Sequence, residues 1–103
     1  MGNQALYREI AQTVNQTLGR QAITATLIKQ TIAEAKKVRQ IRGSWGLIRF
    51  LENRAERLLS PHEVEKLKQH PRWKELTTRM LEHLAAQRVI TPTEALMLKR
   101  MVS

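Results

Sequence analysis

The sequence has no cysteine, so it can form no disulfide and offers no thiolate to a metal ion. No apolar run approaches the roughly 20 residues that a membrane-spanning helix needs. The chain starts Met-Gly-Asn-Gln, without the charged and apolar regions of a signal peptide. From these absences we expect a soluble, cytoplasmic protein that makes no contact with a membrane.

Aspartate is also absent, and this shortage of acids leaves a formal net charge of +9 over 103 residues. Between Gly19 and Leu51 the only acid is Glu34. The same segment holds seven basic residues, which are Arg20, Lys29, Lys36, Lys37, Arg39, Arg42 and Arg49. From Ser60 onward the balance is closer, with eight basic residues and five acids. A concentrated basic field suits a polyanion, and nucleic acid is the commonest polyanion that proteins meet.

No arrangement of residues typical of catalysis is visible. The four glycines are scattered, so there is no glycine-rich phosphate loop. None of the three serines lies in the context of a nucleophile elbow. The three histidines, His62, His70 and His83, lack the spacing of metal ligands. We therefore expect a protein that is not an enzyme and that has no catalytic residue, no metal and no cofactor.

Strand signals are nearly absent, whereas apolar residues recur at helical spacing along most of the chain. We predict helices over residues 3–18, 24–42, 45–59, 60–69, 71–88 and 91–101, the first two ending at Gly19 and Gly43. The fold class is thus all-α, a compact bundle of five or six short helices in a single domain of residues 1–103. Ile48 and Trp73 should face inward. The rest of the expected core is Leu6, Ile10, Val14, Leu27, Ile32, Leu47, Leu51, Leu58, Leu76, Leu81 and Leu84.

Two helix starts carry the pattern of a capping box, in which the first side chain and a glutamate three residues later bond each other's backbone N–H. One begins at Ser60 and uses Glu63, and the other begins at Thr91 and uses Glu94. Both have proline directly after the cap, the position where the missing N–H costs least. We expect a helix to start at each box.

The helix predicted over residues 24–42 has a basic face opposite its apolar face. Lys29 and Lys36 fall on it, with Lys37 at its edge, and Arg39 and Arg42 follow in sequence. Soluble helices usually interleave both signs of charge for pairing between adjacent turns, and here few acids are near. We predict that these five residues contact phosphates. The simpler alternative is a basic face that only meets solvent.

The next helix adds an aromatic side chain outside the core. Trp45, Arg49 and Asn53 fall on the side opposite the leucines. An indole beside arginines can stack on an unpaired base while the arginines bind the backbone. Gly43 and Gly46 would let a strand approach closely. Two alternatives stay open for Trp45, namely contact with a partner protein and packing against a neighbouring helix.

The basic segment KKVRQIRGSWGLIRF, residues 36–50, and the helical periodicity of the whole chain give a profile that resembles the small helical subunits of CRISPR effector complexes. This resemblance implies an antiviral defence complex in which lysines and arginines line the path of RNA or single-stranded DNA. It also implies flat contacts with a larger protein subunit and with copies of the same chain. The expected function is therefore non-catalytic, largely sequence-independent binding of the phosphate backbone.

Two other functions fit the same residues. The first is a protein-interaction adaptor or assembly factor whose basic face meets an acidic partner. The second is a sequence-specific DNA-binding regulator, in which residues 6–40 form a helix-turn-helix. In that motif the N-terminal residues of the second helix read the bases, but here the basic residues lie toward its middle and C-terminal end.

Overall fold

The computed structural model describes residues 4–102 and contains five α-helices within that range. They are α1 (Gln4–Leu18), α2 (Ala25–Leu58), α3 (Pro61–Lys68), α4 (Trp73–Ala86) and α5 (Pro92–Val102). No strand occurs among the described residues, so the predicted all-α class is confirmed. Over the same range, no helix has the length and apolar character needed to cross a membrane.

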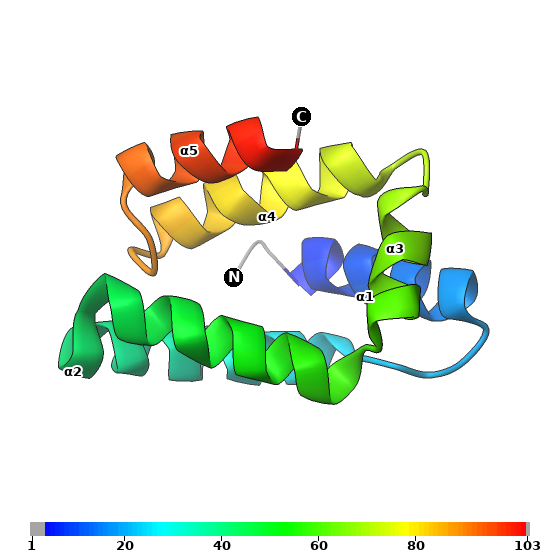
Figure 1. The fold of residues 1–103 in the computed structure, drawn as a ribbon, viewed down its shortest axis with the longest axis horizontal. Helices are drawn as coiled ribbons and strands as arrows, with labels where there is room; N and C mark the ends of the chain where they lie inside the picture. Colours follow the sequence, from blue (N-terminus) through cyan, green and yellow to red (C-terminus); the bar gives the residue numbers. More distant parts are fainter. Residues whose placement is uncertain (1–3, 103) are drawn as a thin grey trace.

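The helical segments include two antiparallel pairs, which α3 joins at one end (Figure 1). Helices α4 and α5 pack together on one side, while α2 folds back on itself on the other side and forms two arms, residues 25–42 and 44–58. Helix α1 packs against α2 and α3, and α3 leads from the end of α2 to the start of α4. The α2 hairpin therefore presents one flank to the core and another to solvent.

The reversal in α2 occurs at Gly43, which has φ 72° and ψ −167°. This backbone conformation is essentially restricted to glycine, since a side chain would clash there. Gly46 is needed for a second reason, because a Cβ atom on it would lie 2.3 Å from the Cβ of Arg42. The prediction that Gly43 separates two helical segments is confirmed. Both glycines have a local role in the elbow of α2, which is the turn at residues 42–46.

The helix starts follow the predicted side-chain chemistry. Ser60 and Glu63 make both bonds of a capping box at α3. At α5, the backbone N–H of Thr91 donates to Glu94 Oε1 at 2.7 Å, and the N–H of Glu94 donates to Thr91 Oγ1 at 3.1 Å. Each box satisfies backbone donors that have no partner within a helix. The sequence patterns therefore located both helix starts correctly.

Helix α4 is shorter than the predicted range of 71–88 at both ends. Its start is delayed because His70 holds a turn, accepting a bond from the N–H of Arg72 at its Nδ1 atom over 3.0 Å. Its end is a turn in which Arg88 adopts φ 61°, a conformation that normally favours glycine. The N–H of Val89 closes this turn by donating to the carbonyl of Leu84 at 2.9 Å.

The core differs in its members from the predicted one. Five expected core residues are buried, namely Leu6, Val14, Leu47, Leu76 and Leu81. Trp73 and the other six expected core residues are only half-buried, because a chain of this size buries only part of its apolar surface. These six are Ile10, Leu27, Ile32, Leu51, Leu58 and Leu84. Ile48 is 45% exposed, so its predicted inward orientation is wrong. It lies between the second arm of α2 and α5, where an apolar cleft remains open.

Candidate nucleic-acid interface

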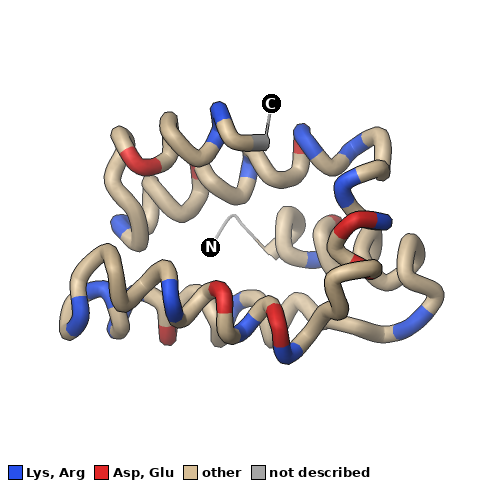
Figure 2. Tube along the Cα trace, viewed as in Figure 1, with Lys and Arg blue, Asp and Glu red and all other residues tan. Residues whose placement is uncertain are grey.

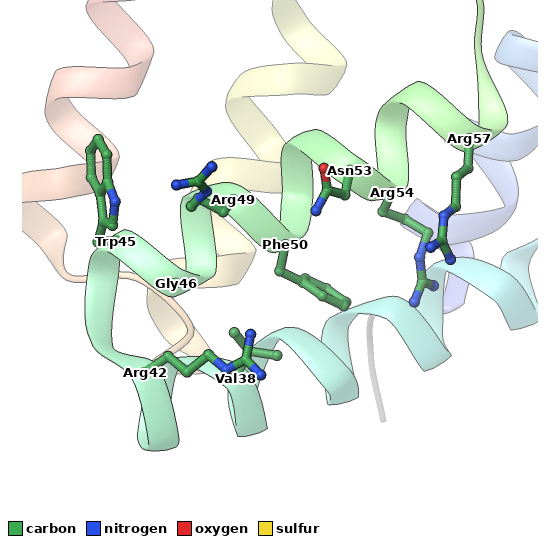
Figure 3. Close-up of a pocket in the computed structure, with 9 residues that line it drawn as sticks. All are labelled: Val38, Arg42, Trp45, Gly46, Arg49, Phe50, Asn53, Arg54 and Arg57. Atoms are coloured by element: carbon green, nitrogen blue, oxygen red, sulfur yellow. The ribbon is translucent and has the colours of Figure 1, made fainter.

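A groove of about 500 Å³ runs between the two arms of α2. Val38 and Arg42 line it from the first arm, and the other lining residues come from the second arm (Figure 3). These others include Trp45, Arg49 and Asn53. The groove therefore brings together four of the eight predicted site residues: Arg42, Trp45, Arg49 and Asn53. We call it the hairpin groove.

Trp45 is the most distinctive residue of the hairpin groove. It lies in the elbow, at the start of the second arm, and is 71% exposed. The prediction that this indole lies outside the core is confirmed. So large an exposed fraction is unusual for a tryptophan, because this residue is highly buried in most proteins. Its ring face is accessible to a planar partner, and the guanidinium of Arg49 lies one helical turn away (Figure 3).

Arg54 lines the hairpin groove but is held by the protein itself. Its guanidinium donates to Glu34 Oε2 at 2.5 Å and to Thr31 Oγ1 at 3.1 Å. It also lies over the ring of Phe50, 5.0 Å from the centroid. These contacts join the two arms of α2. They also neutralise Glu34, the only acid in the basic segment between Gly19 and Leu51.

The other arginines of the hairpin groove are exposed. Arg42, Arg49 and Arg57 form no ion pair with any described residue. Among the described residues that line the groove, none is acidic. Figure 2 shows Lys and Arg gathered around the elbow of α2. The result is a group of guanidinium groups without acidic partners in the described range, close to an exposed aromatic ring.

The structure separates the remaining predicted residues from the hairpin groove. Lys29 and Lys36 line a different cavity, between α1, α2 and α4. Lys37 is exposed and lines neither of these two sites. Arg39 turns toward α5, where its Nη1 atom lies 2.9 Å from Glu94 Oε1. The predicted basic face is thus split over three sides of the first arm.

The pair formed by Arg39 and Glu94 connects the first arm of α2 to the capping box of α5. The backbone N–H of Thr91, with the Ser44 hydroxyl and the Arg39 guanidinium, lowers the pKa of Glu94. The carboxylate therefore stays charged, and the side chain of Arg39 is only 21% exposed. This geometry gives Arg39 a structural contact within the protein.

Sequence reasoning did not include Arg57, Phe50 or Arg54 in the site. A signal for Arg57 was present, because Trp45, Arg49, Asn53 and Arg57 recur every four residues and so share one side of a helix. The positions of Phe50 and Arg54 depend on how closely the two arms approach, which only the folded hairpin shows.

The described residues contain no group of three or more His, Cys, Asp or Glu side chains that could hold a metal ion. The chemistry available in the hairpin groove is therefore that of guanidinium, amide and aromatic groups. Comparison with known proteins adds no further assignment, because no family model, curated protein or solved structure matches this chain.

Proposed function

We propose that this chain binds nucleic acid through the hairpin groove, without catalysing a reaction and largely without sequence preference. The observation that carries this proposal is the exposed Trp45 among arginines that have no acidic partner in the described part of the chain. Arginine binds phosphate oxygens through two parallel N–H groups, whereas the phosphates themselves carry no sequence information.

The preferred ligand in this proposal is a single strand, either RNA or single-stranded DNA. A base in a duplex is already stacked on its neighbours, whereas an unpaired base can stack on the exposed indole of Trp45. The row from Trp45 to Arg57 follows one helix for three turns, about 16–18 Å. A strand lying along this row would place its backbone beside Arg49 and Arg57 and a base on the indole.

We also propose that the chain acts as a small subunit of a larger nucleoprotein complex. The support is a group of exposed apolar side chains along the cleft between the second arm of α2 and α5, which are Ile48, Met97, Leu98 and Met101. A small subunit of a CRISPR effector complex, with an antiviral role in the cytoplasm, is the specific form of this proposal. Its support is the all-α build and the place of residues 36–50 at the elbow.

The same apolar surface favours a second candidate function, a helical adaptor that binds another protein. In that case the arginines of the hairpin groove would meet acidic side chains in place of phosphates. The two functions differ in what they predict at physiological salt. A backbone binder retains single strands with a steep dependence on salt, because binding releases counterions. An adaptor does not bind nucleic acid under these conditions.

Fluorescence anisotropy with labelled single-stranded RNA and DNA of mixed sequences, titrated at several salt concentrations, tests the proposal. Arg42→Gln combined with Arg49→Gln should weaken binding to every sequence at least tenfold and make the log–log salt slope shallower by about 1.4. The matched control is Lys74→Gln with Arg100→Gln, two exposed basic residues on α4 and α5. Equal losses in both double variants, or no binding by the unmodified chain, would refute the proposed groove.

A further inference from the structure

A second cavity, of about 300 Å³, lies where α1, α2 and α4 meet. This volume is at the lower end of the roughly 300–1,000 Å³ that ligand pockets occupy. Its polar lining residues are Gln4 and Tyr7 from α1, Lys29 and Lys36 from α2, and His83 and Gln87 from the C-terminal end of α4. None of the described residues that line it is acidic.

The two deepest lining residues form a buried polar pair. Tyr7 and His83 are 8% and 7% exposed, and the Tyr7 hydroxyl lies 2.5 Å from Nε2 of His83. Burial raises the pKa of Tyr7 and lowers the pKa of His83, so both rings are neutral near pH 7. A buried hydrogen-bonded pair costs more to desolvate than two apolar side chains would.

The two lysines supply the charge. Lys29 and Lys36 are seven residues apart, which places them two turns apart on one side of the first arm, about 10 Å along the axis. Neither forms an ion pair with any residue in the described range 4–102. Their flexible stems allow both ammonium groups to approach one ligand that lies between them.

We propose that this cavity binds a phosphate monoester dianion, either inorganic phosphate or the terminal phosphate of a nucleotide or a strand. A monoester carries about −1.5 to −2 charges near neutral pH and has three strong acceptor oxygens. Two ammonium groups and the amide donors of Gln4 and Gln87 match that charge and those acceptors. The phosphodiester inside a strand carries only one charge, so the ligand proposed here differs from the one proposed for the hairpin groove. The two sites also share no lining residue.

Lys37 provides a matched control, because it is the next residue after Lys36 but lines neither the cavity nor the hairpin groove. Isothermal titration with inorganic phosphate should show one saturable site. Lys36→Gln should weaken it about tenfold, since it removes a charge-assisted hydrogen bond. Lys37→Gln should change the affinity less than about twofold, because distant exposed charges are largely screened by salt. Thermal melts must show that both variants remain folded.

A spectroscopic measurement locates the ligand. Inorganic phosphate should shift the NMR signals of the His83 and Tyr7 rings in the unmodified chain and in Lys37→Gln, and much less in Lys36→Gln at the same concentration. Comparing a trinucleotide bearing a 5′-phosphate with its 5′-hydroxyl form distinguishes the two sources. If the 5′-phosphate form binds more tightly than both its 5′-hydroxyl form and inorganic phosphate, the site takes strand ends. If it binds no more tightly than inorganic phosphate, the site takes small phosphates.

Two results would overturn the proposal. One is the absence of saturable phosphate binding together with unchanged His83 and Tyr7 signals. The other is an equal loss of affinity in Lys36→Gln and Lys37→Gln, because that would show a diffuse attraction to the whole basic helix. Neither result bears on the hairpin groove, whose arginines are unchanged in these variants.

Discussion

Arginines have opposite surroundings at the two ends of this molecule. Near α1 and α4, Arg72 and Arg79 both bind the carboxylate of Glu9, and Arg72 also donates to Glu75 at 2.9 Å. At the elbow of α2, Arg42 and Arg49 have no acidic partner among the described residues. The first set fastens two helices together, whereas the second leaves its charge available to a partner.

The difference depends on where the few acids stand. Glu9 lies on α1 and reaches across to α4, so its partners are distant in the sequence. Around the elbow, Glu34 is bound by Arg54 and Glu94 by Arg39, and no acid among the described residues lines the hairpin groove. Thus the same residue type stabilises the fold in one place and is available for binding in another. The local supply of carboxylates is what separates the two cases.

The largest effect should come from detaching the α2 hairpin from the core. Leu47 is 2% exposed, so Leu47→Ala should cost about 2–5 kcal/mol of unfolding free energy. The adjacent Ile48 is an internal control because it points to the open cleft, and Ile48→Ala should cost less than about 1 kcal/mol. Urea unfolding of both variants measures this. Similar losses in the two variants would contradict the observed packing.

The elbow itself should be almost as sensitive. Gly43→Ala should cost about 1–3 kcal/mol, because φ 72° with ψ −167° is strained for any residue with a side chain. Gly43→Asn should be equally damaging, since asparagine tolerates the left-handed helical region but not this one. Thermal unfolding would show the loss. Recovery of stability by asparagine would mean that the elbow has a different backbone conformation.

Trp45 tests whether the arginines at the elbow of α2 belong to a binding site, because its indole lies beside them. If an unpaired base stacks on its indole, Trp45→Ala should cost about 1–3 kcal/mol of single-strand affinity. Duplex affinity and unfolding free energy should hardly change, because the ring is exposed and carries no charge. Equilibrium binding and melting curves test both points. Lost stability without lost affinity would instead make Trp45 part of the structure.

The smallest effect concerns acid sensitivity, which should belong to the end of the molecule with paired arginines. Hydrogen bonds from Arg72 and then Arg79 lower the pKa of Glu9 below its ordinary value of 4.5. Its contribution to stability is therefore present above pH 4.5 and is lost as the pH falls toward the lowered value. Glu9→Gln should reduce the decline in melting temperature below pH 4.5. It should leave single-strand binding at neutral pH close to that of the unmodified chain.

Most of the fold could be predicted because its signals are local. Leucine spacing predicted the helices, and the side chains of Ser60 and Thr91 predicted two starts through bonds spanning three residues. Gly43 predicted the division of α2 through its backbone preference. The turn at Arg88 was missed because no glycine marks it, and its bond from Val89 to Leu84 forms around a residue with a side chain.

Only part of the candidate site could be predicted. Trp45, Arg49 and Asn53 share one side of a helix, so their spacing was sufficient to group them. The pairing of Arg39 with Glu94 joins residues 55 apart in the chain, and no spacing rule reports such a contact. The same holds for Tyr7 and His83, which meet only when α1 packs beside α4.

The elbow also affects the order in which the two cavities can form during folding. All residues that line the hairpin groove lie within residues 38–57, because Gly43 folds one continuous segment back on itself. Contacts between residues close in sequence need little loop closure and form quickly. The cavity at Tyr7 and His83 joins residues 76 apart and must wait for the chain to collapse. The hairpin groove can therefore take shape before the bundle around it is complete.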